Sequence, residues 1–262
     1  MIKCSIFKKE SIVLIFISFL CGILIPFFNI STDLLDVYNF EQIFLMSRES
    51  WIEPGKFSSE IICVIIPLSL FSVFISNSIL DNYDIVKTYI FIRYKNIKKW
   101  FISNSVLTMI LSIISSAFYN IGIMLVCVVL GFKIADIRIM TCIILYSIFS
   151  IAMISYIISI ISITVAFFTD IKNSIFISIF FLVSSIITST LLPSKITKWL
   201  WSSHFFEYWH NPSDKIMFLV NGNTIYENGN TTTFEFSVIF LLIIAVVENI
   251  LSYYSINKSD YI

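Results

Sequence analysis

Six long apolar segments, separated by polar ones, dominate the chain. They cover residues 12–28, 61–80, 101–130, 139–168, 174–192 and 234–251. Because a helix needs about 20 apolar residues to cross a bilayer, each segment is close to or beyond the required length. The pattern predicts an all-α integral membrane protein, with one transmembrane domain over residues 1–262 and six transmembrane helices. The 101–130 and 139–168 segments are overlong, so we expect their helices to tilt or to project from the bilayer.

The polar segments predict the orientation. The loop 81–100 carries five Lys and Arg residues against two Asp residues, and loops rich in Lys and Arg stay in the cytoplasm. Both chain ends then lie in the cytoplasm, and residues 29–60 and 193–233 form outer loops. In this orientation more of the Lys and Arg residues lie inside than outside, as the same rule requires.

The loop 81–100 also has the spacing of a short amphipathic helix. The apolar residues at positions 85, 86, 89 and 90 fall on one helical face, with Asp84 and Lys87 largely off it. One reading is a plain topology signal that meets anionic lipid headgroups. The alternation of Tyr89, Tyr94 and Trp100 with the cations favours a second reading, in which the helix docks into a groove on another protein.

Composition agrees with a membrane location. The chain is 58% hydrophobic and 13% charged, whereas soluble domains carry about 25% charged residues. The formal net charge is zero, so nothing indicates a nucleic-acid partner, and the five cysteines have no metal-like spacing. Abundant Ile, Phe, Ser, Asn and Lys are typical of an AT-rich bacterial genome, which points to a bacterial cell membrane. The first apolar segment is too long for a signal-peptide core, so we expect it to be retained.

Motifs for enzyme chemistry are absent from the sequence. It contains no G-x-x-x-x-G-K-[ST], H-E-x-x-H or G-x-S-x-G pattern. We therefore expect no catalytic activity and no cofactor bound directly by this chain. His204, Glu207 and His210 are spaced i, i+3, i+6, but on a helix they fan over about 120°, too wide for three metal ligands. No metal site is predicted, and an aromatic helix at the membrane surface is the favoured reading.

Three polar residues within the spans are candidate sites. Glu248 is the one carboxylate well inside a span, where acids are often proton relays or ion ligands. The alternative is that Glu248 simply reaches the inner surface. For Asn77 and Asn120, the favoured reading is that their amide side chains form hydrogen bonds between helices and do not contact a substrate.

Large aromatic residues crowd the first part of the outer loop 193–233. Trp199, Trp201 and Trp209 are the clearest members of this group. Trp and Tyr are enriched where a membrane meets water. We expect an interfacial outer helix here, between the fifth and sixth spans.

The segment from Tyr89 to Asn104, YIFIRYKNIKKWFISN, is similar to the Arg, polar residues, Lys-Lys-Trp segment of the permease subunits of type-2 ABC transporters. With six spans, both ends inside and no nucleotide motif, the whole chain resembles these permeases. Small bacterial permeases of peptide export and lantibiotic immunity are the most similar group. One departure is the short segment before the first span, so the connecting helix of many members is expected to be short or absent.

The resemblance implies a mechanism. The loop 81–100 would be the coupling helix, seated in a separate ABC ATPase subunit that binds the ATP. The residues expected to couple to the ATPase are Asp84, Tyr89, Arg93, Tyr94, Lys95, Lys98 and Trp100. A second permease copy or a sister permease would complete the path for a peptide-like, amphipathic cargo, with membrane lipid around the complex.

A different class of function stays open. The chain could be a stand-alone immunity or sensor protein that binds a toxic peptide at its outer aromatic loop and needs no ATPase. A neighbouring reading frame with a nucleotide-binding motif would favour the transporter. A membrane-embedded enzyme is disfavoured because no plausible acid, base or nucleophile set is present.

Overall fold

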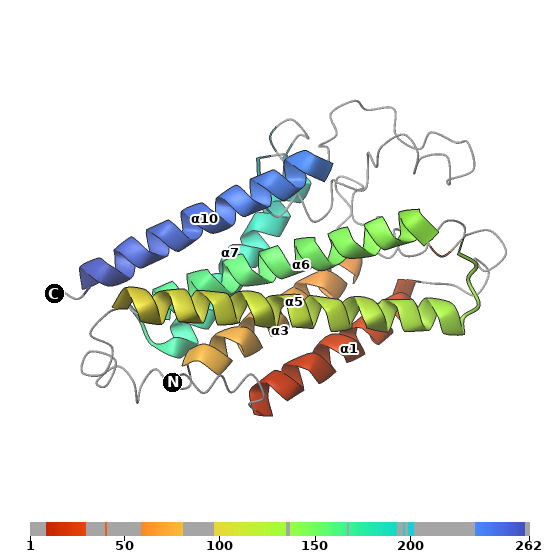
Figure 1. The fold of residues 1–262 in the computed structure, drawn as a ribbon, viewed down its shortest axis with the longest axis horizontal. Coiled ribbons are helices and arrows are strands. Elements are labelled where there is room, and N and C mark those ends of the chain that lie inside the picture. The colour runs from red at the N-terminus through yellow and green to blue at the C-terminus, as the bar shows by residue number, and fades with distance from the viewer. Residues whose placement is uncertain are drawn as a thin grey trace.

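The computed structural model describes residues 9–29, 40, 59–80, 97–134, 137–166, 168–192, 196, 199–201 and 234–259. Within them the chain forms six long helices (Figure 1): α1 Lys9–Asn29, α3 Ser59–Leu80, α5 Ile97–Val129, α6 Ile137–Ala166, α7 Ile171–Leu191 and α10 Phe234–Ser259. The prediction of an all-helical chain is confirmed, and each predicted apolar segment lies almost wholly within one helix. α10 differs most from its predicted bounds, since it continues beyond residue 251 to Ser259.

The end of α5 is set by Gly131. Its φ of 85° lies in the left-handed region, which glycine adopts without a steric penalty. The Gly131 amide donates to the Val128 carbonyl at 3.0 Å, and the Phe132 amide donates to the Cys127 carbonyl at 3.1 Å. These two bonds form a Schellman turn, which satisfies carbonyls that the helix end would otherwise leave without partners.

α6 is the central helix of the bundle. It packs against α3, α5, α7 and α10, while α1 lies on the far side of α5 and α3. Every side chain from Ser150 to Ile160 is buried. About 72% of the apolar window of α6 is buried, against 22% of that of α10. Consecutive helices run back and forth along the long axis of the molecule (Figure 1).

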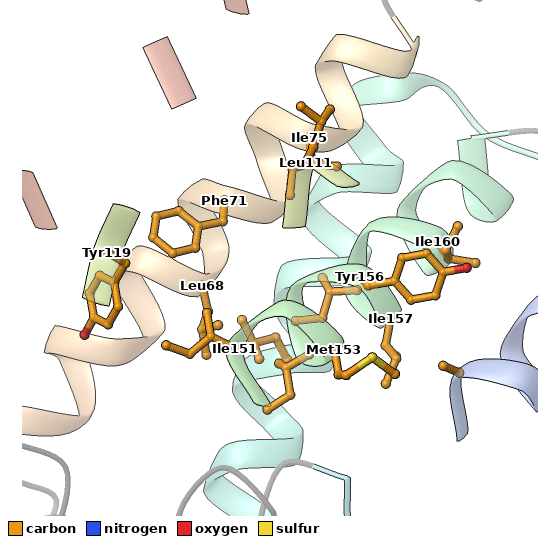
Figure 2. Close-up of a cluster of buried hydrophobic side chains, with 14 of the residues drawn as sticks. Leu68, Phe71, Ile75, Leu111, Tyr119, Ile151, Met153, Tyr156, Ile157 and Ile160 are labelled. Carbon is orange, nitrogen blue, oxygen red and sulfur yellow. The ribbon is translucent and has the colours of Figure 1, made fainter. Parts of the chain in front are cut away.

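The core is where α3, α5 and α6 meet. Leu68, Phe71 and Ile75 of α3 point toward side chains of α5 and α6 (Figure 2). The rings of Phe71 and Tyr119 meet edge to face, with centroids 6.0 Å apart and an interplanar angle of 74°. This is a favoured aromatic geometry, and it ties α3 to α5 at the level of the central helix.

The outer surface of the bundle is apolar and its interior is rich in hydroxyl groups. On α1, Ile12, Phe16, Leu20 and Leu24 form an exposed stripe at four-residue spacing, while Ser18 is fully buried. A soluble protein has the opposite arrangement. The distribution fits a membrane protein in which lipid covers the exposed side chains.

Within the part of the chain that the structure describes, three helices are long and apolar enough to cross a bilayer. Their apolar parts are Lys98–Val129, Met140–Ala166 and Phe236–Ile256. The described side chains of α1, α3 and α7 form shorter apolar stretches, Ser11–Leu24, Ile65–Asn77 and Lys172–Thr188. The chain is thus compatible with a transmembrane protein.

α1 and α5 cross with their backbones in contact. A Cβ atom added to Gly22 would lie 2.0 Å from the Tyr119 carbonyl oxygen, and one added to Gly122 would lie 2.6 Å from the Phe19 carbonyl oxygen. Both distances are far below van der Waals contact. Small residues at helix crossings are the usual means of close packing in lipid, and here each helix supplies a glycine at the crossing point.

Candidate functional site

Small polar side chains are buried along the antiparallel helices α5 and α6, and we call this set the α5–α6 seam. Its members on α5 are Ser105, Thr108, Ser112, Ser116 and Asn120, and on α6 they are Ser147, Ser150, Ser155, Ser159 and Ser162. All of them are buried. Small hydroxylated residues let membrane helices approach closely and bond to one another, and Ser147 and Asn120 form such a bond between α6 and α5.

Asn120 anchors the seam at one end. The Ser147 hydroxyl donates to the Asn120 Oδ1 atom. The Asn120 Nδ2 group donates to the Ser116 carbonyl at 2.7 Å. Asn120 is only 1% exposed, and both polar ends of its amide therefore have partners, as a buried amide requires. The sequence prediction that Asn120 bonds between helices agrees with this geometry.

Further along the seam, several hydroxyls have no partner within the described residues. They belong to Ser105, Ser112, Ser155 and Ser162. Because α5 and α6 are antiparallel, equal steps from the Asn120–Ser147 bond bring Ser112 level with Ser155. A hydroxyl both donates and accepts hydrogen bonds. The seam therefore supplies hydroxyl and amide groups that can form hydrogen bonds, and none of its members is an acid or a base.

A second polar contact attaches α10 to the central helix. The Tyr156 hydroxyl of α6 donates to the Asn249 Oδ1 atom at 2.8 Å, and the Asn249 Nδ2 group donates to the Ala245 carbonyl at 2.6 Å. This contact joins α10 to the central helix and fixes the rotation of α10 about its axis.

Removing this phenol is expected to weaken the attachment of α10. Tyr156→Phe should lower stability by about 0.6 kcal/mol, and by no more than about 1.7 kcal/mol, the range of hydrogen bonds between membrane helices. A double-mutant cycle with Asn249→Ala, read by thermal unfolding in detergent, isolates the pair. Tyr254→Phe is the matched control, because Tyr254 lies on α10 and is 67% exposed. Additive effects of the two substitutions at 156 and 249 would contradict the contact.

The predicted ATPase-coupling residues lie mostly outside the described residues. This holds for Asp84, Tyr89, Arg93, Tyr94 and Lys95. The two remaining members are in the first turn of α5, where Lys98 is exposed and Trp100 is buried, with 8% of its surface accessible. The Trp100 side chain therefore belongs to the packed interior of the bundle.

The other two predicted polar residues are separated from the seam. Asn77 lies half-buried near the end of α3. Glu248 lies half-buried on α10, directly before Asn249, and forms no ion pair with a described residue. The structure thus does not bring Asn77, Asn120 and Glu248 together into one site.

The predicted outer aromatic residues gather between α7 and α10. Trp199 is 60% exposed and meets the rings of Phe236 and Phe240 edge to face, at 5.7 and 6.2 Å. Trp201 is buried and stacks on Phe181, with ring centroids 6.0 Å apart. Trp209, like His204 and His210, lies outside the described residues. The two tryptophans therefore differ: Trp199 is available to a ligand, whereas Trp201 is part of the packing.

Sequence reasoning missed Tyr156 and Asn249, which lie 93 positions apart and meet only in the fold. Their signal in the sequence is weak, since one Tyr and one Asn within apolar segments do not reveal each other. Among the described residues no group of three His, Cys, Asp or Glu side chains could hold a metal ion.

Comparison with known proteins does not identify a family for this chain. No protein-family model, curated protein or solved structure matches the chain. We therefore infer the function from the sequence and from the packing of the helices.

Proposed function

We propose that this chain is the transmembrane permease subunit of a type-2 ABC transporter that exports a peptide across or out of a bacterial cell membrane. The observation that carries the proposal is the junction at the start of α5. The segment that resembles a coupling helix leads directly into a 33-residue helix, whose first turn exposes Lys98 and Lys99. The chain has no nucleotide-binding motif of its own, so ATP would be bound by a partner subunit.

The helix directions support six spans with both ends inside. Because consecutive helices alternate in direction (Figure 1), the start of α5 lies at the same end of the bundle as the α6–α7 turn. Lys98, Lys99 and Lys172 are exposed at this end, whereas Lys133 and Arg138 are the exposed cations described at the other. Cations collect on the cytoplasmic side of membrane proteins, and an ATPase subunit would bind there.

The packing offers a route from the ATPase to the bundle centre. A helix of 33 residues is about 50 Å long, so a displacement of its first turn acts on the whole length of α5. The Asn120–Ser147 bond and the rest of the α5–α6 seam join α5 to the central helix. Movement of a docked coupling helix would therefore reach α6 and, through Tyr156, α10.

Charge reversal in the coupling segment tests the proposal. Arg93→Glu combined with Lys95→Glu is expected to abolish co-purification of an ATPase subunit from detergent-solubilised native membranes, because each substitution puts an anion where a cation is expected to contact the ATPase. Membrane insertion and thermal stability should stay as in the wild type, since both positions precede α5. Partners are identified by mass spectrometry.

The matched control reverses two cations at the opposite end of the bundle. Lys133→Glu with Arg138→Glu changes the net charge equally, and both side chains are exposed. This pair should retain the ATPase. An ATPase that stays bound to the Arg93 and Lys95 variant would refute the coupling assignment, and a wild-type preparation without any ATPase would refute the permease proposal.

Exposed Trp199 favours the second candidate function. With Phe236 and Phe240 it forms an aromatic surface at the end of the bundle opposite the α5 start, and such a surface suits the apolar side of a peptide. A stand-alone peptide-binding immunity protein would use this surface and would purify without an ATPase. The same pull-down therefore separates the two candidates.

A further inference from the structure

Glu248 stands apart from every other described charged side chain. It lies within the apolar part of α10, Phe236–Ile256, which places it about 18 Å from one end and about 12 Å from the other at 1.5 Å per residue. The remaining charged side chains of the described region lie at helix ends or in turns: Lys98, Lys99, Lys133, Arg138, Asp170 and Lys172. Among the described side chains, Glu248 is therefore the one charge that lies away from the ends of an apolar helix.

This chain cannot neutralise Glu248 from within a span. Glu248 has no ion-pair partner among the described residues. None of the six apolar segments contains a Lys or Arg residue, so a second copy of the chain would not offer a cation at this depth either. A carboxylate in hydrocarbon is costly unless it is paired or protonated, and for this reason intramembrane acids usually mark a functional site. Neither the described residues nor the six apolar segments supply a counter-charge for Glu248.

The surroundings of Glu248 are open on one side. The neighbouring residues Val247 and Leu251 are 45% and 56% exposed, and α10 is far less covered than α6. One turn further along, Ser252 is 1% exposed, and its hydroxyl has no partner in the described residues. Residues four apart share a helix face. The carboxylate thus lies between an exposed apolar surface and an unused buried hydroxyl.

The rotation of α10 that produces this arrangement is fixed. The Tyr156–Asn249 hydrogen bond of 2.8 Å directs Asn249 toward the central helix. Glu248, the adjacent residue, is therefore held to the side of that contact rather than within it, where it is half-buried. The side chain is accessible from the membrane without any change in the packing of α10.

We propose that the α10 face formed by Glu248, Val247 and Leu251 binds the cationic group of an amphipathic peptide. The ammonium or guanidinium group would pair with the Glu248 carboxylate, while the apolar side of the peptide would lie on Val247 and Leu251. This inference rests on the proposed peptide transport and narrows its cargo to cationic amphipathic peptides. The negative charge of Glu248 favours a cationic peptide at this face.

The test measures peptide binding to the purified full chain in phosphatidylcholine nanodiscs, whose lipid has no net charge. The probe is a synthetic amphipathic helical peptide with lysines on its polar face, and the reference is the same peptide with glutamines in their place. Wild type should bind the lysine peptide about tenfold more tightly, which corresponds to about 1.4 kcal/mol. Glu248→Gln should remove this preference, and Glu248→Asp, which keeps the charge, should retain most of it.

Two results would overturn the inference: equal affinity of wild type for both peptides, or an unchanged preference in Glu248→Gln. Thermal unfolding of Glu248→Gln checks that the variant is folded, and Glu248→Asp provides the comparison if it is not. Failure of the proposed function is separate, because it appears as the absence of an ATPase in the pull-down. A Glu248-dependent preference without an ATPase would retain the peptide site and reassign the chain to peptide sequestration.

Discussion

Gly22→Leu is expected to destabilise the folded chain by at least about 3 kcal/mol, the upper range for overpacking a closely packed site. A Cβ atom at this position would lie 2.0 Å from the Tyr119 carbonyl oxygen and 2.9 Å from its carbon. Both atoms belong to the α5 backbone, so no side-chain rotation can relieve the clash. α1 and α5 would have to separate along their whole contact.

The smaller change Gly22→Ala tests the helix crossing by the sign of its effect on the stability of the protein. In an exposed helix interior, alanine is more favourable than glycine by about 1 kcal/mol. If α1 did not touch α5 at this point, Gly22→Ala would therefore stabilise the protein. Because α1 and α5 cross at Gly22, we expect Gly22→Ala to destabilise the protein. Gly122→Ala should also destabilise it, because its Cβ atom would lie 2.6 Å from the Phe19 carbonyl oxygen.

Thermal unfolding of the purified protein in detergent, followed by size-exclusion chromatography, measures this effect. Gly131→Ala is the matched control: a Cβ atom there meets nothing within 4 Å, but the φ of 85° disfavours alanine. We expect a loss of about 1 kcal/mol for this control, from the backbone alone. A Gly22→Ala variant at least as stable as wild type would show that the two helices do not cross here.

Asn120→Asp is expected to cost about 3–5 kcal/mol at neutral pH, the usual penalty for an uncompensated buried charge. The side chain is 1% exposed, and its Nδ2 group donates to the Ser116 carbonyl at 2.7 Å. An ionised carboxylate would place an oxygen against that carbonyl oxygen. The substitution hardly changes the volume of the side chain, so a large effect would report polarity rather than packing.

Two further variants make the Asn120 prediction specific. Asn120→Leu removes the bond to Ser147 without adding charge and should cost only about 1 kcal/mol. Asn77→Asp makes the same chemical change at a half-buried position and should cost less than Asn120→Asp. All are compared by thermal unfolding in one detergent. Equal losses for Asn77→Asp and Asn120→Asp would contradict a buried Asn120 at the centre of the bundle.

The positions of the helices could be predicted because exposing unpaired peptide groups to lipid is costly. A long apolar segment avoids this cost by forming a helix, which pairs its peptide groups internally. The boundaries agree to within a few residues for five of the six segments. α5 stops where predicted because Gly131 provides the left-handed turn. α10 runs on because the residues after 251 contain no Gly or Pro, and Ser252 and Ile256 continue its packed face.

The sequence by itself therefore determined that this is an all-helical chain, and approximately where each helix lies. The tertiary structure decided which helices touch: Gly22 with Gly122, Ser147 with Asn120, and Tyr156 with Asn249. The physical reason is that these helices are apolar on nearly every side, so hydrophobic periodicity does not distinguish a packed face from a lipid-facing one. Single glycines and isolated polar residues select the partners, and their complements lie on other helices, far away in the sequence.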